Sequence, residues 1–279
     1  MTATDRLAAR LTVGVLGLGE AGSEIAGGLA AAGVRVRGFD PVQPAPAGVD
    51  MAAGDADACR GAALVISLVT AEAAEDALRM ALPGLAGSTV YADANTSAAG
   101  LKQRLADTAG QAGITFADVA IMAPVPGRGL AVPMLMSGPG AEAASAILAA
   151  CGGRAEIVAG PPGTAATRKL LRSVFYKGMA VAAIEALQAA RAAGCEDWLR
   201  EHLAAELAAA DAATLARLEE GSYQHARRRA QEMAAASTML GELGVPDRIA
   251  SASPRWLADL AAGRPASLLR RCGPCRSHR

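Results

Sequence analysis

The sequence predicts an α/β protein in which a doubly wound parallel sheet is followed by an all-α C-terminal domain. A short apolar strand near Thr12 runs directly into a glycine-rich turn and a helix. Strand and helix signals then alternate, and from Gly163 onward helix signals occur almost alone. This alternation is typical of doubly wound sheets. We therefore expect a sheet domain at 1–160, a helical domain at 161–265 and a flexible tail at 266–279.

The glycine-rich turn reads Gly17-Leu18-Gly19-Glu20-Ala21-Gly22. In a nucleotide site, Gly17 permits the tight turn, Gly19 lets a pyrophosphate approach the backbone, and Gly22 lets the helix pack on the strand. The N–H groups and positive dipole end of that helix would face the phosphates. We therefore expect a Rossmann-type sheet with the cofactor against all six residues. A glycine-rich turn without a ligand is the alternative.

A second strand at 34–39 ends in Asp40, which lies 18 positions after Gly22 (40 − 22 = 18). A carboxylate about 20 residues after the glycines accepts hydrogen bonds from the ribose hydroxyls and repels a 2′-phosphate. This spacing favours NAD as the cofactor. Arg35 and Arg37 on the same strand leave NADP possible.

The remaining elements of the first domain continue the alternation. A buried parallel strand is indicated by the unbroken apolar run Leu64–Val69. Because ligands bind at the carboxyl ends of such strands, Val69 and Thr70 are expected over the cofactor. Further strands are predicted at 89–93, 114–120, 133–138 and 155–158, with helices at 55–61, 72–81, 98–110 and 141–151.

The second half is predicted to contain only helices. The boundary lies near Gly160–Pro162, and Arg227–Arg229 is expected on a solvated helix face. In the tail, Cys272 and Cys275 match a redox motif, but the strand and helix that such a motif needs are missing. With His278 they offer at most three zinc ligands where structural sites use four, so we predict no metal. The helices are expected at 163–193, 196–210, 211–220, 222–242 and 246–262.

Composition excludes several function classes. The 279 residues carry 27 basic and 27 acidic side chains, and aromatic residues make up only 3%, so neither nucleic acid nor a membrane surface is an expected partner. No apolar signal segment and no run of about 20 apolar residues occur, so no membrane span is expected. The five cysteines are scattered, which favours a cytoplasmic protein with reduced thiols.

A nicotinamide enzyme that oxidises an alcohol needs a group that accepts the hydroxyl proton. The three histidines, His202, His225 and His278, have no catalytic spacing, so lysine is the alternative. Two of the three lysines in the chain lie on the first helix after the predicted boundary.

That helix carries a polar and cationic stripe. At about 100° per residue, Lys169, Ser173 and Tyr176 lie on one face, with Lys177 at its edge. A cationic stripe facing a dinucleotide cleft suits an anionic substrate. The pattern alone leaves open that Lys169 is a surface lysine whose stem covers apolar surface.

The chain resembles the β-hydroxyacid dehydrogenases, the group of the 3-hydroxyisobutyrate and 6-phosphogluconate dehydrogenases. The matching pieces run nearly its full length: Gly17–Gly22, the strand to Leu68, Asp93-x-Asn95-Thr96, Pro124-Val125-Pro126-Gly127, and Gly163 followed after five residues by Lys169.

The resemblance implies that Lys169 is the acid–base catalyst. It also implies a helical second half that usually forms dimers. Substrate contacts are implied near Asn95, Thr96 and Gly127, and cofactor contacts at Leu68, Val69 and Asn95.

The departures from the family pattern lie at substrate positions. Ser173 replaces a common asparagine, and Asn95 replaces a common serine. Pro126-Gly127-Arg128 replaces a common Ser-Gly-Gly. The run Arg172–Gly178 looks like that of a phosphogluconate-dehydrogenase-like subgroup with its own helical C-terminal domain, so the fold carries over better than the substrate.

The sequence thus predicts a homodimeric, NAD(P)-dependent oxidoreductase. Hydride would pass between the nicotinamide and a small anionic β-hydroxyacid or its oxo form, while Lys169 exchanges the proton. Arg128 or Lys177 would pair with a carboxylate or phosphate of the substrate. Ser173, Asn95, Thr96 and Gly127 would orient it. Two alternatives remain open: reduction of imines or other carbonyls on the same scaffold, and a dinucleotide-binding sensor without turnover.

Overall fold

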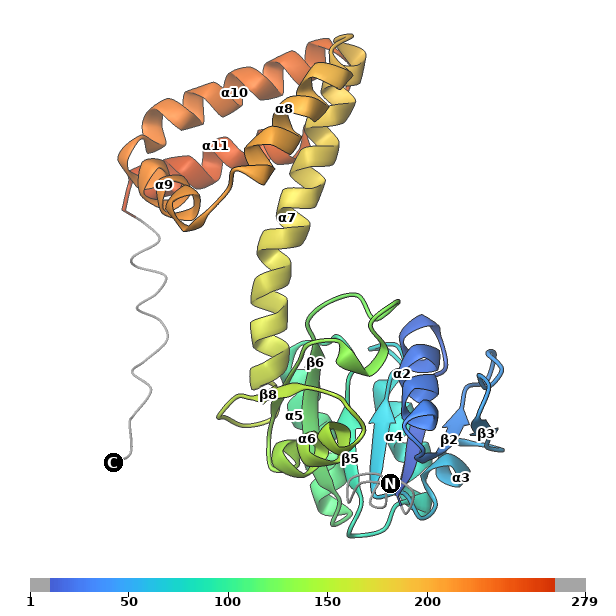
Figure 1. The fold of residues 1–279 in the computed structure, drawn as a ribbon. Helices are drawn as coiled ribbons and strands as arrows, with labels where there is room; N and C mark the ends of the chain where they lie inside the picture. Colours follow the sequence, from blue (N-terminus) through green and yellow to red (C-terminus); the bar gives the residue numbers. More distant parts are fainter. Residues whose placement is uncertain (1–10, 264–279) are drawn as a thin grey trace. The chain divides into compact units, whose positions relative to one another are not determined.

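The computed structural model describes residues 11–263 (Figure 1). Its contacts divide the chain between Ser173 and Val174, within helix α7 (Thr164–Ala192). The predicted boundary at 160/161 stays a prediction, and the predicted tail with Cys272 and Cys275 lies outside the described residues.

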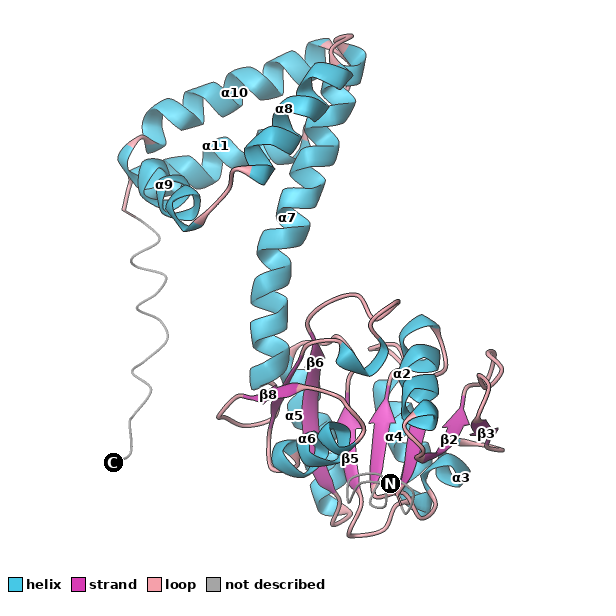
Figure 2. Ribbon diagram, in the orientation of Figure 1, coloured by secondary structure: helices cyan, strands magenta, loops and turns pink. Residues whose placement is uncertain are grey.

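The first part is built on one eight-stranded sheet with the order β3-β2-β1-β4-β5-β6-β7-β8. All neighbouring strands run parallel except β6 and β7, which are antiparallel. The predicted α/β fold class is therefore confirmed, with the second part consisting of helices (Figure 2). The strands are β1 Thr12–Leu16, β2 Arg35–Phe39, β3 Val49–Met51, β4 Leu64–Ser67, β5 Val90–Asp93, β6 Thr115–Ile121, β7 Met134–Ser137 and β8 Ala155–Ile157.

Two features of the sheet differ from the prediction. Strand β3, which follows the proline-rich stretch Pro41–Pro46, was not expected. Strand β7 runs antiparallel to β6 because the chain between them holds only the short turn η2 (Gly129–Ala131). A parallel neighbour needs a crossover connection, usually through a helix. The sheet is consequently parallel only up to β6 and again between β7 and β8.

Helices cover both faces of the sheet because the buried strands are apolar on both sides. On β5, Val90 and Ala92 belong to one buried cluster and Tyr91 to the other, as expected for side chains that alternate along a strand. Helices α2 and α6 pack on the first cluster, and α3, α4 and α5 pack on the second. Their bounds are α2 Glu20–Ala31, α3 Asp55–Cys59, α4 Ala74–Ala81, α5 Ala99–Gln111 and α6 Ala141–Ala150; η1, Leu82–Gly84, follows α4.

The second part consists of the rest of α7 and four further helices in its described residues. A small buried cluster joins Ala189, Leu240 and Ala250. Glu185 on α7 accepts hydrogen bonds from the N–H groups of Ile249 and Ala250 at 2.8 Å each, which satisfies the start of the last helix. The helices are α8 Glu196–Ala208, α9 Ala212–Gln224, α10 Ala226–Glu242 and α11 Arg248–Ala261.

One helix boundary was predicted wrongly. Helix α9 continues through Gly221, and the break before α10 comes at His225. A Cβ on Gly221 would lie 2.9 Å from the Arg229 guanidinium, so this glycine gives room for packing instead of ending a helix. Arg229 is half-buried and donates to Ser222 Oγ, whereas Arg227 lies on the expected solvated face.

No helix in residues 11–263 is both long enough and apolar enough to cross a bilayer. Over the same range, no three histidine, cysteine, aspartate or glutamate side chains are grouped so that they could hold a metal ion.

Candidate functional site

The turn between β1 and α2 is closely packed except at one position. Gly17 has φ +87°, and a Cβ there would lie 2.4 Å from the Leu68 carbonyl oxygen. A Cβ on Gly22 would lie 1.9 Å from the Gly17 carbonyl oxygen. At Gly19, by contrast, nothing lies within 4 Å of the added atom. Glycine is therefore needed for packing at Gly17 and Gly22, and space for a ligand remains at Gly19.

The rest of the predicted cofactor motif surrounds this opening. Leu18 is buried, whereas Glu20 is exposed at the first position of α2, and Ala21 is half-buried. No side chain caps this end of α2, and the first N–H groups of a helix have no partner within the helix, so they suit an acceptor from a ligand. Leu68 and Val69, which follow β4, are half-buried beside the turn.

Asp40 joins the end of β2 to the glycine turn. Its Oδ2 accepts from the N–H of Leu18 at 2.8 Å, and its Oδ1 accepts from those of Val42 and Gln43 at 2.8 Å each. Partial burial acts to raise the pKa of Asp40, but the three backbone N–H groups outweigh it and lower the pKa below its usual value. The side chain is thus a carboxylate at neutral pH.

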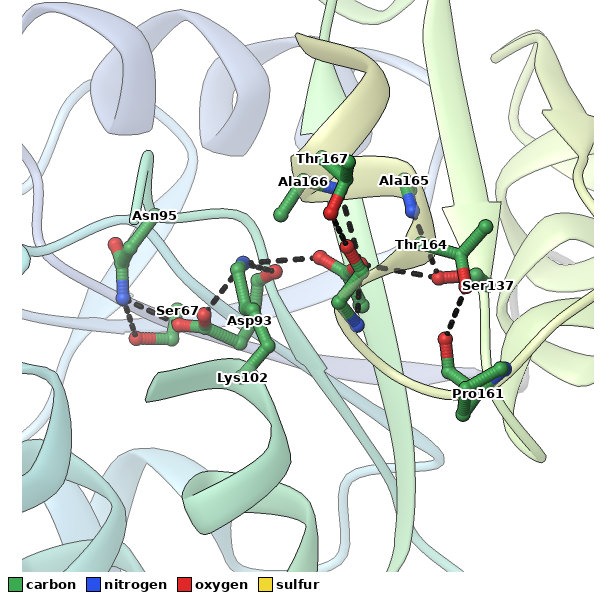
Figure 3. Close-up of polar contacts among 12 residues, drawn as sticks. Ser67, Asp93, Asn95, Lys102, Ser137, Pro161, Thr164, Ala165, Ala166 and Thr167 are labelled. Atoms are coloured by element: carbon green, nitrogen blue, oxygen red, sulfur yellow. Dashed lines mark hydrogen bonds and ion pairs between the residues drawn. The ribbon is translucent and has the colours of Figure 1, made fainter. Parts of the chain in front are cut away.

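A buried polar network follows the carboxyl ends of β4 and β5 (Figure 3). Asn95 is 4% exposed, and its Nδ2 donates to Ser67 Oγ at 3.1 Å and to Asp93 Oδ1. Its Oδ1 has no hydrogen-bond partner among the described residues. A buried amide oxygen without a partner is costly, so this atom is suited to accept a hydrogen bond from a ligand.

The first turn of α7 is held by side chains from β6 and β7. Asp118 Oδ2 accepts from the N–H groups of Gly163 at 2.9 Å and Ala166 at 3.1 Å, and from Ser137 Oγ at 3.0 Å. Ser137 Oγ in turn accepts from the N–H of Ala165 at 3.0 Å. A carboxylate at a helix N-terminus also interacts favourably with the helix dipole. The sheet therefore fixes the beginning of α7.

Lys102 lies at the centre of this network and is fully buried on α5. Its Nζ lies 2.6 Å from Asp93 Oδ2 and 3.2 Å from Asp118 Oδ1. Burial raises the pKa of Asp93, and the Lys102 ammonium opposes that rise. Figure 3 shows Lys102 and Asp93 in contact, with Asn95 on the far side of Asp93.

Sequence reasoning missed the part that Lys102 and Asp118 take in the site. One signal was present: Lys102 shares the buried face of α5 with Leu105 and Ala109, at helical spacings of three and seven residues. A lysine on an apolar stripe requires a buried anionic partner. The buried strands β5 and β6 supply two such partners, Asp93 and Asp118.

The predicted residues on α7 lie just beyond the capped turn. Lys169 and Ser173 are both half-buried and four residues apart, which places them on the same helix face. Lys177 is exposed and follows the division of the chain, so it belongs to the second part.

The other predicted substrate contacts lie on loops. Thr96 is exposed directly after Asn95. Gly127, with φ +75°, and Arg128 are exposed in the loop after β6. The buried side chain of Val125 anchors that loop, and its carbonyl oxygen accepts from the N–H of Arg128 at 2.8 Å.

Thr70 is exposed after β4, and its Oγ1 accepts from the N–H of Ala73 at 3.3 Å. The structure thus brings Asn95 and the first turn of α7 to one edge of the sheet through the buried network. Thr70, Thr96, Gly127 and Arg128 are exposed, and their contacts with cofactor or substrate stay predictions.

Two protein-family models match the chain. The model described as the NAD binding domain of 6-phosphogluconate dehydrogenase matches residues 12–159. A domain of unknown function, DUF1932, matches residues 190–260. The comparison with curated proteins gave no match.

Solved structures resemble the chain over most of its length. A conserved hypothetical protein from Sinorhizobium meliloti 1021 is 28% identical, with a TM-score of 0.58 over 92% of this chain and 89% of its own. Conserved protein MTH1747, of unknown function and described as similar to 3-hydroxyacid dehydrogenases, is also 28% identical (TM-score 0.58, 91% and 98%). An imine reductase from Myxococcus stipitatus in complex with NADP+ is 18% identical (TM-score 0.76, 91% and 95%), a likeness of fold alone.

Proposed function

Because the chain belongs to the family of the NAD binding domain of 6-phosphogluconate dehydrogenase, we propose that it is an NAD(P)-dependent oxidoreductase acting on a small anionic β-hydroxyacid or its oxo form. The capped first turn of α7 carries this proposal. Asp118 and Ser137 hold the helix that bears Lys169 at the sheet edge where doubly wound folds bind their ligands.

The residues of the glycine turn fit a dinucleotide. The open space at Gly19 admits a pyrophosphate, and the uncapped N-terminus of α2 supplies N–H donors to it. The Asp40 carboxylate suits the hydroxyls of the adenosine ribose. When bound, the nicotinamide accepts or gives the hydride.

Lys169 supplies the proton transfer in this proposal. As a neutral amine it accepts the proton of the substrate hydroxyl during oxidation, and as an ammonium it returns a proton to the oxo group during reduction. Such general acid–base catalysis contributes about 10²–10⁴-fold. The half-buried position of Lys169 gives it partial shelter from water.

The neighbouring polar groups would orient the substrate. Asn95 Oδ1, buried and without a partner among the described residues, is an acceptor for a ligand N–H or O–H group. Ser173 lies one turn after Lys169 on the same face, and Thr96 and Gly127 would add contacts from loops. Arg128, or Lys177, would pair with the anionic group of the substrate.

The test is a spectrophotometric screen of hydroxyacids with NAD+ and NADP+. We expect NADH or NADPH absorbance to appear with at least one small anionic β-hydroxyacid and to depend on enzyme concentration. Dinucleotide binding without absorbance change across the whole panel would instead support a sensor without turnover.

Imine reduction is a second candidate, favoured by the similarity in fold to imine reductases. The same scaffold would then use Lys169 or another donor to protonate the nitrogen. Presenting amines and hydroxyacids in parallel separates the two candidates, because only the matching class produces reduced cofactor.

We further propose that NAD is preferred over NADP. Replacing Asp40 with asparagine removes the charge that opposes a 2′-phosphate and keeps one oxygen acceptor for Val42 and Gln43. The ratio of NADPH to NADH affinity, measured by cofactor fluorescence, is expected to rise about tenfold, equivalent to about 1.4 kcal/mol. Asp50→Asn, at an exposed carboxylate paired with Arg35, is the matched control and leaves the ratio unchanged. Equal affinities in the wild type would contradict the preference.

A homodimer is also proposed, on the evidence of apolar exposure in the second part. The side chains of Val174, Ile184, Trp198 and Trp256 are all more than half exposed, and the buried cluster of these helices is small. Burying such a surface against a second copy would supply the missing core. Light scattering is expected to give twice the chain mass of 28.0 kDa, and a monomer at micromolar concentration would contradict this.

A further inference from the structure

Three oxygens surround the buried ammonium of Lys102. It donates hydrogen bonds to the Asp93 carbonyl at 2.7 Å and to Asp93 Oδ2 at 2.6 Å, and it forms an ion pair with Asp118 Oδ1 at 3.2 Å. Asp118 Oδ1 accepts no hydrogen bond among the described residues. None of the three side chains is more than 1% exposed. A buried ion pair seldom adds to the free energy of unfolding, because well-packed apolar residues of similar size often stabilise a protein as much or more.

Each carboxylate that Lys102 contacts holds a different part of the candidate site. Asp93 Oδ1 accepts from Asn95, whose other amide atom has no partner among the described residues. Asp118 Oδ2 accepts from the N–H groups of Gly163 and Ala166 in the first turn of α7. Lys102 therefore joins the residue that orients Asn95 to the residue that caps α7.

The charges make this connection depend on the ammonium. Two carboxylates and one ammonium leave one negative charge, which the N-terminal dipole of α7 partly offsets at Asp118. Without Lys102, the Asp93 and Asp118 carboxylates would lie close together in a dry environment with no cation. Their repulsion would separate them, and the separation would loosen what they hold.

Lys169 lies three residues after Ala166, which is about 4.5 Å along the helix axis. Because both lie on one rigid helix, Lys169 is expected to move by nearly the same distance as the capped turn. A displacement of about 1 Å at a reacting group can cost about 100-fold in rate.

We propose that Lys102 is a positioning residue for the reaction. It holds Asp93 and Asp118 together, so that Asn95 and the first turn of α7 keep a fixed position relative to each other. The position of Lys169 on α7 is fixed in the same way. This role rests on the proposed function, since it needs a reaction at Lys169. The structural part of the proposal, that Lys102 stabilises the first turn of α7 through Asp118, can be tested without turnover.

The test replaces Lys102 with methionine, which keeps an unbranched side chain one atom shorter and removes its charge. Arg104→Met is the matched control, because Arg104 is an exposed cation on the same helix, paired with Glu75. For Lys102→Met we expect kcat to fall at least tenfold with the substrate found in the screen. NADH affinity, measured by fluorescence, should fall less than kcat, since the glycine turn and Asp40 lie outside the network and Asn95 is the one predicted cofactor contact that belongs to it. Arg104→Met should match the wild type in both.

Hydrogen–deuterium exchange gives a second measurement that needs no substrate. In Lys102→Met, the amides of 163–170 are expected to exchange at least tenfold faster, while those of α2 stay unchanged. If the wild type turns over no substrate, this result still supports the structural part of the proposal and only the proposed function fails. Unchanged exchange at 163–170 together with unchanged kcat would overturn the inference.

A parallel loss of kcat, NADH affinity and cooperative unfolding would also overturn it, since that pattern marks a role in folding alone. Should Lys102→Met fail to fold, Asp118→Asn decides in the same assays. This variant keeps the pair of Lys102 with Asp93, removes the ion pair of Lys102 with Asp118, and weakens the cap of α7. Faster exchange at 163–170 with a lower kcat supports the inference, and wild-type values of both refute it.

Discussion

Lys169→Ala is expected to lower kcat by about 10²–10⁴-fold and to leave NADH affinity within twofold of the wild type. The reason is that the amine would act only on the reacting proton, whereas the glycine turn and Asp40 would bind the dinucleotide. Steady-state absorbance at saturating cofactor and NADH fluorescence titration measure the two quantities on the same preparations.

Arg168→Ala is the matched control for this variant. Arg168 precedes Lys169, is 52% exposed, and lies 3.9 Å from Glu156 in a surface ion pair of little energetic weight. Its removal should leave kcat and NADH affinity unchanged. Wild-type turnover in Lys169→Ala would remove Lys169 from the mechanism and leave only a dinucleotide-binding fold.

Gly22→Ala is expected to weaken NADH binding at least 100-fold and to destabilise the protein by roughly 1–3 kcal/mol. The new Cβ would lie 1.9 Å from the Gly17 carbonyl oxygen, so the turn and α2 must move apart. Fluorescence titration with NADH and chemical denaturation followed by circular dichroism check the two effects.

Gly27→Ala tests whether this effect belongs to the turn. Gly27 lies on the same helix, and a Cβ there would meet nothing within 4 Å. Because alanine is a better helix former than glycine, this variant should be as stable as the wild type or more stable by up to about 1 kcal/mol. Equal NADH affinity in Gly22→Ala and Gly27→Ala would show that the close packing at Gly22 does not serve the cofactor.

The glycine turn and the acid after β2 could be predicted because their signals are local. A strand, three glycines and Asp40 within 29 positions (40 − 12 + 1 = 29) specify one supersecondary unit, and the structure connects Asp40 to the turn through Leu18. The helical second half was equally clear from its periodicity. The helix boundaries were harder to predict. Glycine often ends a helix, but Gly221 lies within α9 and gives room for the Arg229 side chain.

The buried network could not be derived from local pattern because its contacts join distant parts of the chain. Asp118 bonds to Gly163 and Ala166, which lie 45 and 48 residues later. Only the position of Lys102 on the buried face of α5 pointed to it. The antiparallel direction of β7 could have been predicted, because no helix was expected between the strands at 114–120 and 133–138 and a parallel neighbour needs such a crossover.

The proposed function requires that hydride passes between the nicotinamide and the substrate. Isotope labelling tests this transfer most directly. The protein is incubated with small oxo acids and with one of two NADH preparations, each carrying deuterium on one face of C4. The masses of the products are measured by mass spectrometry. We predict one deuterium at the carbinol carbon of a hydroxyacid product, from one face of the nicotinamide only. Tight NADH binding with no deuterium in any product would contradict the proposed reaction.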